Sequence, residues 1–232
     1  MEPIAARLAR VNDRIQAACR AAGRDAASVR LIAVSKTKPI ADVLAAHDAG
    51  QAWFGENKVQ DALAKAEALA GRGLRWAMLG HLQTNKARDV ARFADEFQAL
   101  DSLRVAVELD RRLRAEGRQL DVLIEVNSSG EDSKFGVPPG EVVALARGLA
   151  SCDALRLRGL MTLALRSSDP APVVACFEGM RAVQERLRQT DGLPGTVDEL
   201  SMGMSDDFEL AIAHGATTVR IGRALFGERE PG

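Results

Sequence analysis

The run from Ser201 to Gly227 holds the residue types best suited to binding an anion. It opens with Ser-Met-Gly-Met-Ser-Asp-Asp and closes with Val-Arg-Ile-Gly-Arg-Ala-Leu-Phe-Gly. Each of these two segments lies where an apolar, strand-like run ends. Bare amide groups can approach an oxyanion only where side chains are small. The pattern therefore predicts a phosphate cradle made by two strand ends, with Arg220 between them.

The predicted phosphate donors come from both segments: Ser201, Met202, Gly203, Gly222 and Arg223. We leave out Ser205, Asp206 and Asp207, which read as a helix N-cap followed by acidic first-turn residues. Such carboxylates stabilise a helix start but repel a phosphate. Arg220 has two interpretations, because a charge in Val-Arg-Ile needs a partner or a ligand. It pairs with an acid such as Glu125, or it contacts the ligand directly.

Lys36 ends the apolar run Leu-Ile-Ala-Val-Ser-Lys. The two-residue period of a strand puts Ile32, Val34 and Lys36 on one face. If that face points inward, the lysine is partly desolvated and close to a cation, and both effects favour a neutral amine. Such an amine facing a phosphate cradle suits an aldehyde phosphate held as a Schiff base. A solvated lysine at the start of a loop, like Lys38, is an equally supported alternative.

Other polar residues also follow strand-like runs. Asn57, in Gly-Glu-Asn, is either the N-cap of the next helix or a ligand contact, and the two roles are compatible. His81, Gln83, Asn127 and the loop over 131–136 occupy similar positions. Each of these alone is weak evidence for a site.

The elements that must position these residues alternate along the chain. Eight runs are typical of strands: 30–35, 52–55, 74–79, 96–100, 120–127, 155–163, 197–201 and 217–221. Eight are typical of helices: 39–49, 57–70, 84–94, 103–116, 139–150, 172–188, 206–214 and 223–227. An amphipathic helix precedes them, because Ile4, Leu8, Val11 and Ile15 recur at helical spacing.

This arithmetic predicts an α/β fold, a (β/α)8 TIM barrel with an extra N-terminal helix. An open doubly wound sheet is the alternative, but it normally has fewer strands and a glycine fingerprint after the first one, which Ser-Lys-Thr-Lys does not supply. Barrels carry their chemistry on the C-terminal rim and bind phosphate after strands seven and eight. Both predicted segments lie there. No linker or repeat interrupts the chain, so we expect one domain over residues 1–232.

Composition excludes several classes of partner. The formal net charge is -1, no basic patch is interleaved with aromatic residues and Tyr is absent, so neither nucleic acid nor a membrane surface is indicated. The start lacks a signal-peptide core, and no stretch approaches the roughly 18 apolar residues of a membrane span. Cys19, Cys152 and Cys176 are odd in number and widely spaced, which indicates reduced thiols in the cytoplasm. The three histidines do not cluster, so we expect no metal site.

Several segments together resemble the pyridoxal phosphate homeostasis protein family: Lys36, Gly55-Glu56-Asn57, Gly80-His81-Leu82-Gln83-Thr84-Asn85-Lys86, Arg158-Gly159-Leu160-Met161 and Leu200-Ser201-Met202-Gly203-Met204-Ser205-Asp206. The resemblance runs over residues 30–227, and the serine-methionine-glycine segment is its most specific part. It implies a single-domain relative of the alanine racemase barrel that binds pyridoxal 5'-phosphate (PLP).

The resemblance also implies residue roles. Lys36 would be the Schiff-base lysine and Arg220 the partner of the pyridine nitrogen. Ser201 and Gly203 would be phosphate ligands, and Gly222 would donate its backbone amide to the phosphate. Asn57 would lie near the cofactor. Two positions depart from the family. Lys58 stands where a Tyr is frequent, and Arg223 stands where a small hydroxyl residue is common. Arg223 either adds charge to the phosphate site or costs it a hydroxyl hydrogen bond.

The expected function is intracellular PLP homeostasis without substantial catalysis, with PLP and apo-forms of PLP enzymes as partners and no catalytic residue assigned. A racemase needs acid–base groups on both faces of the substrate carbanion. In alanine-racemase-like enzymes the second group is a Tyr from a further domain and subunit, and this chain has no Tyr. We expect no second domain either, which removes the racemase dimer contact, so we expect a monomer. A PLP-dependent racemase and a Schiff-base aldolase acting on phosphosugars are the alternatives.

Overall fold

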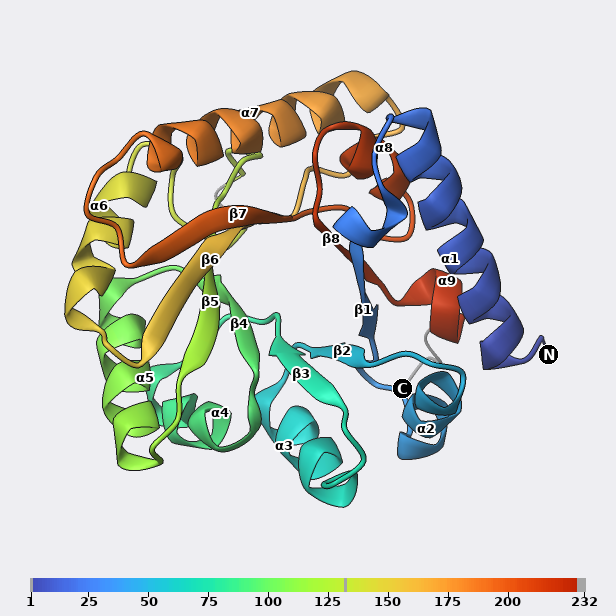
Figure 1. Cartoon of the computed structure of the whole chain (residues 1–232), viewed down its shortest axis with the longest axis horizontal. Coiled ribbons are helices and arrows are strands. Elements are labelled where there is room, and N and C mark those ends of the chain that lie inside the picture. The colour runs from blue at the N-terminus through green and yellow to red at the C-terminus, as the bar shows by residue number, and fades with distance from the viewer. Residues whose placement is uncertain (1, 132, 229–232) are drawn as a thin grey trace.

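The computed structural model describes residues 2–131 and 133–228. Within them, eight parallel strands pair in chain order and β8 pairs back with β1, so the sheet closes into a barrel. Helices surround the ring of strands (Figure 1). The predicted (β/α)8 barrel is thus confirmed. The domain expected over 1–232 also includes residues 1, 132 and 229–232, which lie outside the described residues.

The strands match their predicted ranges to within two residues at each end: β1 (Arg30–Val34), β2 (Trp53–Glu56), β3 (Arg75–Met78), β4 (Glu96–Leu100), β5 (Leu120–Glu125), β6 (Leu155–Met161), β7 (Gly195–Ser201) and β8 (Thr218–Ile221). The α-helices among the described residues are α1 (Ile4–Ala21), α2 (Ile40–Asp48), α3 (Val59–Ala68), α4 (Ala87–Phe93), α5 (Leu103–Ala115), α6 (Val142–Gly148), α7 (Pro170–Arg188), α8 (Phe208–Ala213) and α9 (Arg223–Phe226). Short 3-10 turns cover Ala26–Ser28, Thr84–Lys86 and Leu149–Ser151.

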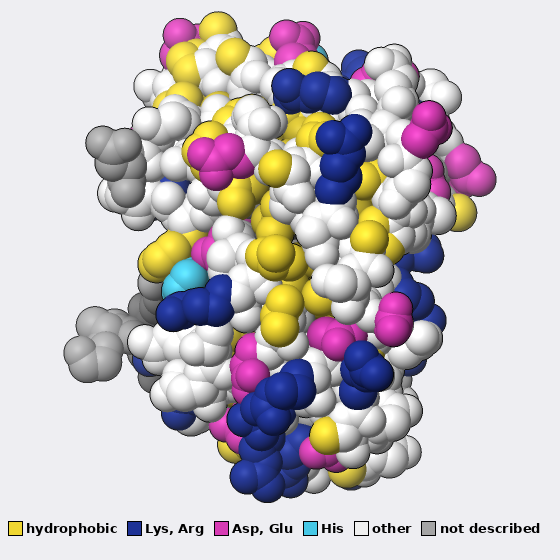
Figure 2. Space-filling view, turned by 90° about the vertical axis from the view of Figure 1, so that its left-hand side faces the viewer, with side chains coloured by type: hydrophobic (Ala, Val, Ile, Leu, Met, Phe, Trp, Pro, Cys, Tyr) yellow, Lys and Arg dark blue, Asp and Glu magenta, His cyan; other side chains and the backbone are white. Residues whose placement is uncertain are grey.

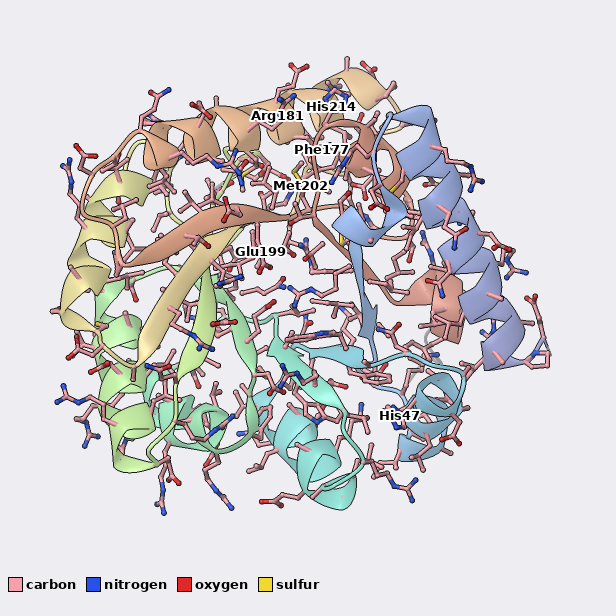
Figure 3. The ribbon with its side chains drawn as sticks, viewed as in Figure 1. His47, Phe177, Arg181, Glu199, Met202 and His214 are labelled. Carbon is pink, nitrogen blue, oxygen red and sulfur yellow. The ribbon has the colours of Figure 1, made fainter. Side chains whose placement is uncertain are left out.

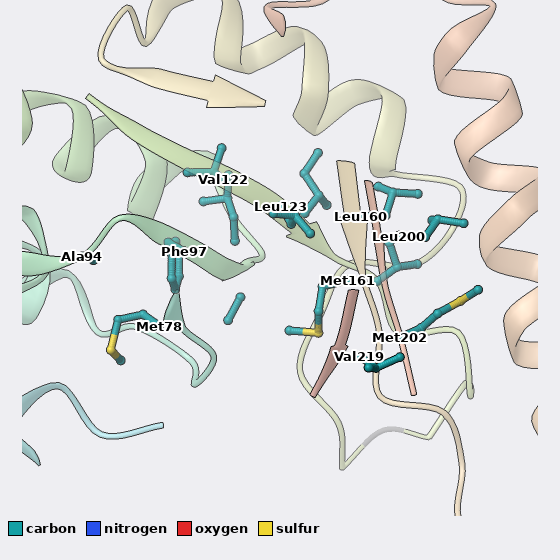
Figure 4. Close-up of a cluster of buried hydrophobic side chains, with 14 of the residues drawn as sticks. Met78, Ala94, Phe97, Val122, Leu123, Leu160, Met161, Leu200, Met202 and Val219 are labelled. Atoms are coloured by element: carbon teal, nitrogen blue, oxygen red, sulfur yellow. The ribbon is translucent and has the colours of Figure 1, made fainter. Parts of the chain in front are cut away.

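Apolar side chains on the outer face of the barrel form the main core with the helices. Phe97, Leu200, Met202 and Val219 are each almost completely buried there, and Figure 4 shows them in one cluster. The extra helix α1 packs on α8, α9 and α2, so it covers the seam between β8 and β1 (Figure 1). Burying these apolar faces contributes about 25 cal/mol per Å². The core therefore fixes which strand ends meet at the rim.

The inside of the barrel is partly polar, which the sequence analysis did not predict. Arg30 on β1 donates to Glu96 on β4 at 2.8 Å and to Glu199 on β7 at 3.0 Å. Since β4 pairs with neither β1 nor β7, these contacts must cross the barrel interior. Figure 3 shows the alternation along β7, with Glu199 inside the ring and Met202 outside it, toward Phe177 on α7. Ile32, predicted to face inward, is fully buried.

The outer surface near α5 combines arginines with exposed apolar residues. Leu103 and Val107 are exposed, and Glu108 forms ion pairs with both Arg111 and Arg112. Figure 2 shows this side of the molecule, where lysine and arginine side chains gather toward one end. None of the described helices combines the length and the hydropathy needed to cross a membrane.

Candidate functional site

The predicted site residues lie at the C-terminal ends of neighbouring strands or just beyond them. Lys36 follows β1 and Asn57 follows β2, and these two strands pair with each other. The remaining residues end or follow β7 and β8, and β8 pairs with both β7 and β1. Because the strands are parallel, all four ends open on one edge of the barrel. The fold thus brings the predicted residues to one side of the C-terminal rim.

Lys36 lies in a tight turn with a strained neighbour. The amide of Lys38 donates to the carbonyl of Ser35 at 3.0 Å, so Lys36 and Thr37 are the central residues of the turn. Thr37 has a φ of 65°, a left-handed conformation that β-branched residues rarely adopt. Lys36 itself is half-buried. Contacts outside the turn must therefore hold this conformation in place.

A buried ion pair supplies such contacts. Lys65 on α3 donates to the carbonyl of Ser35 at 2.7 Å and to Oε1 of Glu56 at 2.6 Å. The Ser35 hydroxyl donates to the same Oε1 at 2.7 Å. All three side chains are buried. The pair joins the ends of β1 and β2 to α3 directly behind Lys36, so it fixes the backbone from which the lysine projects.

Asn57 does not cap α3, contrary to one of its two predicted roles. The N-cap is Lys58, which has an extended backbone and makes no side-chain capping hydrogen bond. The helix starts late because Glu56 still belongs to β2, where its carbonyl accepts from the amide of Leu79 at 2.8 Å. Asn57 is exposed at the rim, so its second predicted role, contact with a ligand, is compatible with its position.

Arg220 is buried and makes two short hydrogen bonds. Nη1 donates to the Ser201 hydroxyl at 2.6 Å and Nη2 donates to the carbonyl of Thr162 at 2.6 Å. Burial lowers the pKa of Arg220 to about 10, against the opposing attraction of Glu125 and Asp207. The side chain is therefore cationic at neutral pH. Within the described residues, no hydrogen bond or ion pair joins it to Glu125, so that acid acts only through space.

Two of the predicted phosphate donors on the β7 loop are engaged elsewhere. The Ser201 hydroxyl donates its hydrogen to Oε1 of Gln98 at 2.7 Å and accepts from Arg220. The amide of Met202 donates to the carbonyl of Thr218 at 3.1 Å, and its side chain lies in the outer core. The prediction that Met202 offers its amide to a phosphate is thus wrong, because the β7–β8 pairing extends one residue further than expected.

The remaining amides of the two loops are better placed. In the described part of the chain, the amides of Gly203, Ser205, Gly222 and Arg223 donate to no protein acceptor. The Ser205 hydroxyl accepts from the amide of Ala224 at 3.3 Å, which joins the two loops. Backbone amides without partners that converge on one point form a nest for an anion. Gly203 and Gly222 thus keep amides without a protein acceptor, as the predicted cradle requires, and so does Ser205, which the prediction left out.

Ser205 was misassigned in the sequence because α8 starts later than expected. The helix begins at Phe208 rather than at 206, and Asp207 turns back to accept from the amide of Met204 at 2.6 Å. Burial raises the pKa of Asp207. The Ser205 side chain is thus released from capping and faces the loop after β8. The sequence feature that could have indicated a loop role for Ser205 is its place two residues after Gly203.

Arg223 is committed to a neighbouring acid. Its guanidinium forms an ion pair with Asp206, and this hydrogen bond raises the pKa of Arg223. A weaker contact reaches Glu228 at 3.6 Å. The side chain therefore neutralises the carboxylate that was expected to repel a phosphate. Only the amide of Arg223 is left to serve the cradle.

The other rim candidates form a separate cluster. His81 contacts Asp101 at 2.7 Å and stacks on Phe135, with ring centroids 4.3 Å apart. Asn127 holds its own loop, because its amide donates to the carbonyl of Glu131 at 2.9 Å. Among the described residues, no three His, Cys, Asp or Glu side chains gather in a way that could hold a metal ion.

Glu125 is a buried acid at the end of β5 that the sequence analysis treated only as a partner for Arg220. Burial, reinforced by Asp101 and opposed by Arg220, raises its pKa to about 7. Because the folded-state pKa lies above the ordinary value, the fold favours protonated over ionised Glu125. The contribution of Glu125 to the free energy of unfolding is therefore fully present below its ordinary pKa and is lost as the pH rises through about 7.

Glu125→Gln should remove this dependence. At pH 8 the variant is expected to be more stable than the wild type by about 3 kcal/mol. The pKa of Glu125 differs by roughly 2.5 units between the folded and unfolded states, and each unit corresponds to about 1.36 kcal/mol. Near pH 4 the two proteins should be equally stable. Urea unfolding across this range measures the difference, with the exposed Glu141→Gln as the matched control. Equal stability of wild type and Glu125→Gln at pH 8 would contradict the prediction.

Comparison with known proteins agrees with this geometry. Residues 7–230 match the family model described as alanine racemase, N-terminal domain. A pyridoxal phosphate homeostasis protein of Pseudomonas aeruginosa is 45% identical over 232 residues, which covers 100% of this chain and 98% of the relative.

Solved structures extend the comparison. PipY of Synechococcus elongatus, solved with PLP bound, is 37% identical with a TM-score of 0.84, and the match covers 97% of this chain and 100% of PipY. An alanine racemase of Clostridium difficile shares only the fold, at 15% identity and a TM-score of 0.75 over 96% of this chain and 57% of the racemase. On the sequence identity and its coverage, the chain belongs to the pyridoxal phosphate homeostasis protein family.

Proposed function

We propose that this protein binds PLP, holds it as a Schiff base on Lys36 and acts in vitamin B6 homeostasis. The observation that carries the proposal is the set of unpartnered amides on two joined loops beside a buried, cationic Arg220. PLP supplies an aldehyde, whose carbon bonds to an amine nitrogen while the carbonyl oxygen leaves as water. The relative from S. elongatus, solved with PLP bound, supports this choice of ligand.

The residues present fit each part of that ligand. The amides of Gly203, Ser205, Gly222 and Arg223 would hold the phosphate. Arg220 would face the ring nitrogen: a guanidinium only donates hydrogen bonds, so it selects an unprotonated acceptor. Lys36 projects from a turn that the Glu56–Lys65 pair immobilises. Its amine therefore reaches the aldehyde at low entropic cost.

We also propose that the protein is a carrier rather than an enzyme. A racemase needs a second acid–base group opposite Lys36. The candidates on the rim include His81, which is engaged by Asp101 and Phe135, and Glu125 with its pKa of about 7. Glu125 is the observation that favours the alternative, a PLP-dependent amino-acid racemase. The absence of Tyr argues against it. Arginine at the ring nitrogen adds less, because an unprotonated ring is a weaker electron sink but racemases tolerate it.

The cellular setting follows the same proposal. The protein acts as a one-domain monomer in the cytoplasm and passes PLP to apo-forms of PLP enzymes. Free, buried thiols at Cys19, Cys152 and Cys176 support a reducing compartment. Analytical ultracentrifugation tests the oligomeric state. Recovery of activity by an apo-enzyme mixed with the loaded protein, in the presence of a trap for free PLP, tests direct transfer.

The carrier proposal predicts negligible racemisation. With the PLP-loaded protein in heavy water, L-alanine is expected to exchange its α-proton slowly, with retention of configuration, because only Lys36 returns a proton. Chiral chromatography and mass spectrometry separate exchange from inversion. Rapid formation of D-alanine that is lost in Lys36→Ala would make the protein an enzyme. Loss of that activity in Glu125→Gln would identify the second acid–base group.

A further inference from the structure

The hydrogen bonds that hold Arg220 continue down the inside of the barrel. Ser201 donates to Oε1 of Gln98 at 2.7 Å, and Nε2 of Gln98 donates to Oε1 of Glu96. Glu96 is in turn ion-paired with Arg30 at 2.8 Å. We call this chain of four contacts, from Arg30 to Arg220, the interior column. The side chains of Glu96, Gln98, Ser201 and Arg220 within it are at most 3% exposed.

The two ends of the column fix the direction of every bond. Arginine only donates, so Arg30 requires an acceptor in Glu96 and Arg220 requires an acceptor in Ser201. The amide nitrogen of Gln98 must then face the Glu96 carboxylate, which leaves its oxygen toward Ser201. The single hydroxyl hydrogen of Ser201 is drawn to that oxygen. A lone pair of Ser201 is therefore directed at Arg220, and the reverse arrangement would set two donors against each other.

Burying a polar side chain at position 98 destabilises the fold unless the side chain makes hydrogen bonds such as these. Barrel interiors are normally filled by branched apolar residues. Gln98 is fully buried on the strand Glu-Phe-Gln-Ala-Leu, between residues that pack outward. Burying an amide is favourable only when its hydrogen bonds are made. One of its two contacts reaches Ser201 on β7 and the other reaches Glu96 on its own strand. Neither contact joins neighbouring strands.

We propose that Gln98 is a positioning residue that sets the orientation of the Arg220 guanidinium. It acts through the Ser201 hydroxyl, which then holds Nη1 while the Thr162 carbonyl holds Nη2. With both nitrogens tethered, the plane of the Arg220 guanidinium is fixed, and so are the directions of its three remaining N–H groups. The consequence for a ligand, selection of an unprotonated ring nitrogen, rests on the proposed function. The orientation of Arg220 itself does not.

The variant Gln98→Met tests the inference, because methionine has nearly the same length and shape but makes no such hydrogen bonds. Gln184→Met is the matched control: Gln184 is a buried glutamine on α7 whose side chain donates to the carbonyl of Val197 at 2.7 Å, outside the barrel. Both variants should lose stability to a similar extent. Crystal structures of both ligand-free variants are then compared with the ligand-free wild type. Arg220 should leave Ser201 or Thr162 in Gln98→Met only.

The ligand half is measured separately with PLP and its carbocyclic analogue, in which the ring nitrogen is a C–H. Wild type and Gln184→Met are expected to prefer PLP by about tenfold, as one hydrogen bond from a charged donor allows. Gln98→Met should reduce that preference to below about threefold. A Gln98→Met structure in which Arg220 keeps both contacts would overturn the inference, whatever the ligands do. Failure of wild type to bind PLP would instead overturn the proposed function.

Discussion

Lys36→Ala is expected to abolish covalent binding of PLP while leaving the barrel folded. The substitution removes the Lys36 amine, the proposed Schiff-base nitrogen, and keeps the backbone contacts of the turn between Ser35 and Lys38. Because Lys36 is half-buried on the rim, its loss takes little from the core. Borohydride reduction followed by mass spectrometry of the intact protein should show the adduct in wild type and none in the variant. Non-covalent affinity through the cradle should remain.

Lys38→Ala is the matched control. Lys38 lies two residues on, and its amine donates to the carbonyl of Glu228 at 2.9 Å, so it is directed along the rim. This variant should form the adduct as the wild type does. A reducible adduct that persists in Lys36→Ala and disappears when Lys38 is also replaced would mean that Lys38 is the reactive amine. Circular dichroism establishes that both variants are folded.

Gly203→Val should destabilise the whole protein, for a reason that differs from the one the sequence suggested. A small residue was expected there so that a phosphate could approach. In the structure, a Cβ at position 203 would lie 2.6 Å from Cβ of Ala211 and 2.9 Å from Cα of Phe208, and φ is 96°. Strain and overpacking against α8 together cost about 3 kcal/mol or more. Urea unfolding should show this loss even without PLP, with weaker PLP binding as a consequence.

Two further variants separate packing from ligand contact. Gly203→Ala combined with Ala211→Gly removes the closest collision and should recover part of the lost stability. Gly179→Ala, on α7 with no atom within 4 Å of the added Cβ, should stabilise slightly, by roughly 0.5–1 kcal/mol. If Gly203→Val unfolds at the same urea concentration as wild type, α8 does not set the requirement for glycine. Ser201→Ala, expected to lose less stability, is predicted to perturb Arg220.

The local patterns of the sequence were sufficient to locate the strands and the rim. Short apolar runs defined each strand to within two residues, and parallel pairing then placed Lys36 beside the loops after β7 and β8. Helix starts were less certain. Asn57 and Ser205 both have the side chain of an N-cap, yet the helices begin later because β2 extends through Glu56 and Asp207 turns back onto the amide of Met204. Tertiary pairing overrides capping preference at both places.

The interior column lay beyond such reasoning. Gln98 and Ser201 are far apart in the sequence, and Arg30 and Glu96 belong to strands that do not pair. No periodicity connects residues across a barrel. The available signal was a Glu and a Gln two residues apart in an otherwise apolar strand, which marks one face as polar. It could not identify the partners.

Closure of β8 onto β1 also determines when a newly made chain can assemble the proposed PLP site. Lys36, the proposed Schiff-base lysine, follows the first strand, whereas Gly203 and Gly222 follow the last two. Ribosomes add roughly 5–20 residues each second, so Lys36 is made on the order of 10–30 seconds before Gly203 and Gly222. During that interval a nascent chain presents an amine without an anion site. Under the proposed function, the capacity to hold PLP at both its aldehyde and its phosphate therefore rises only with completed barrels.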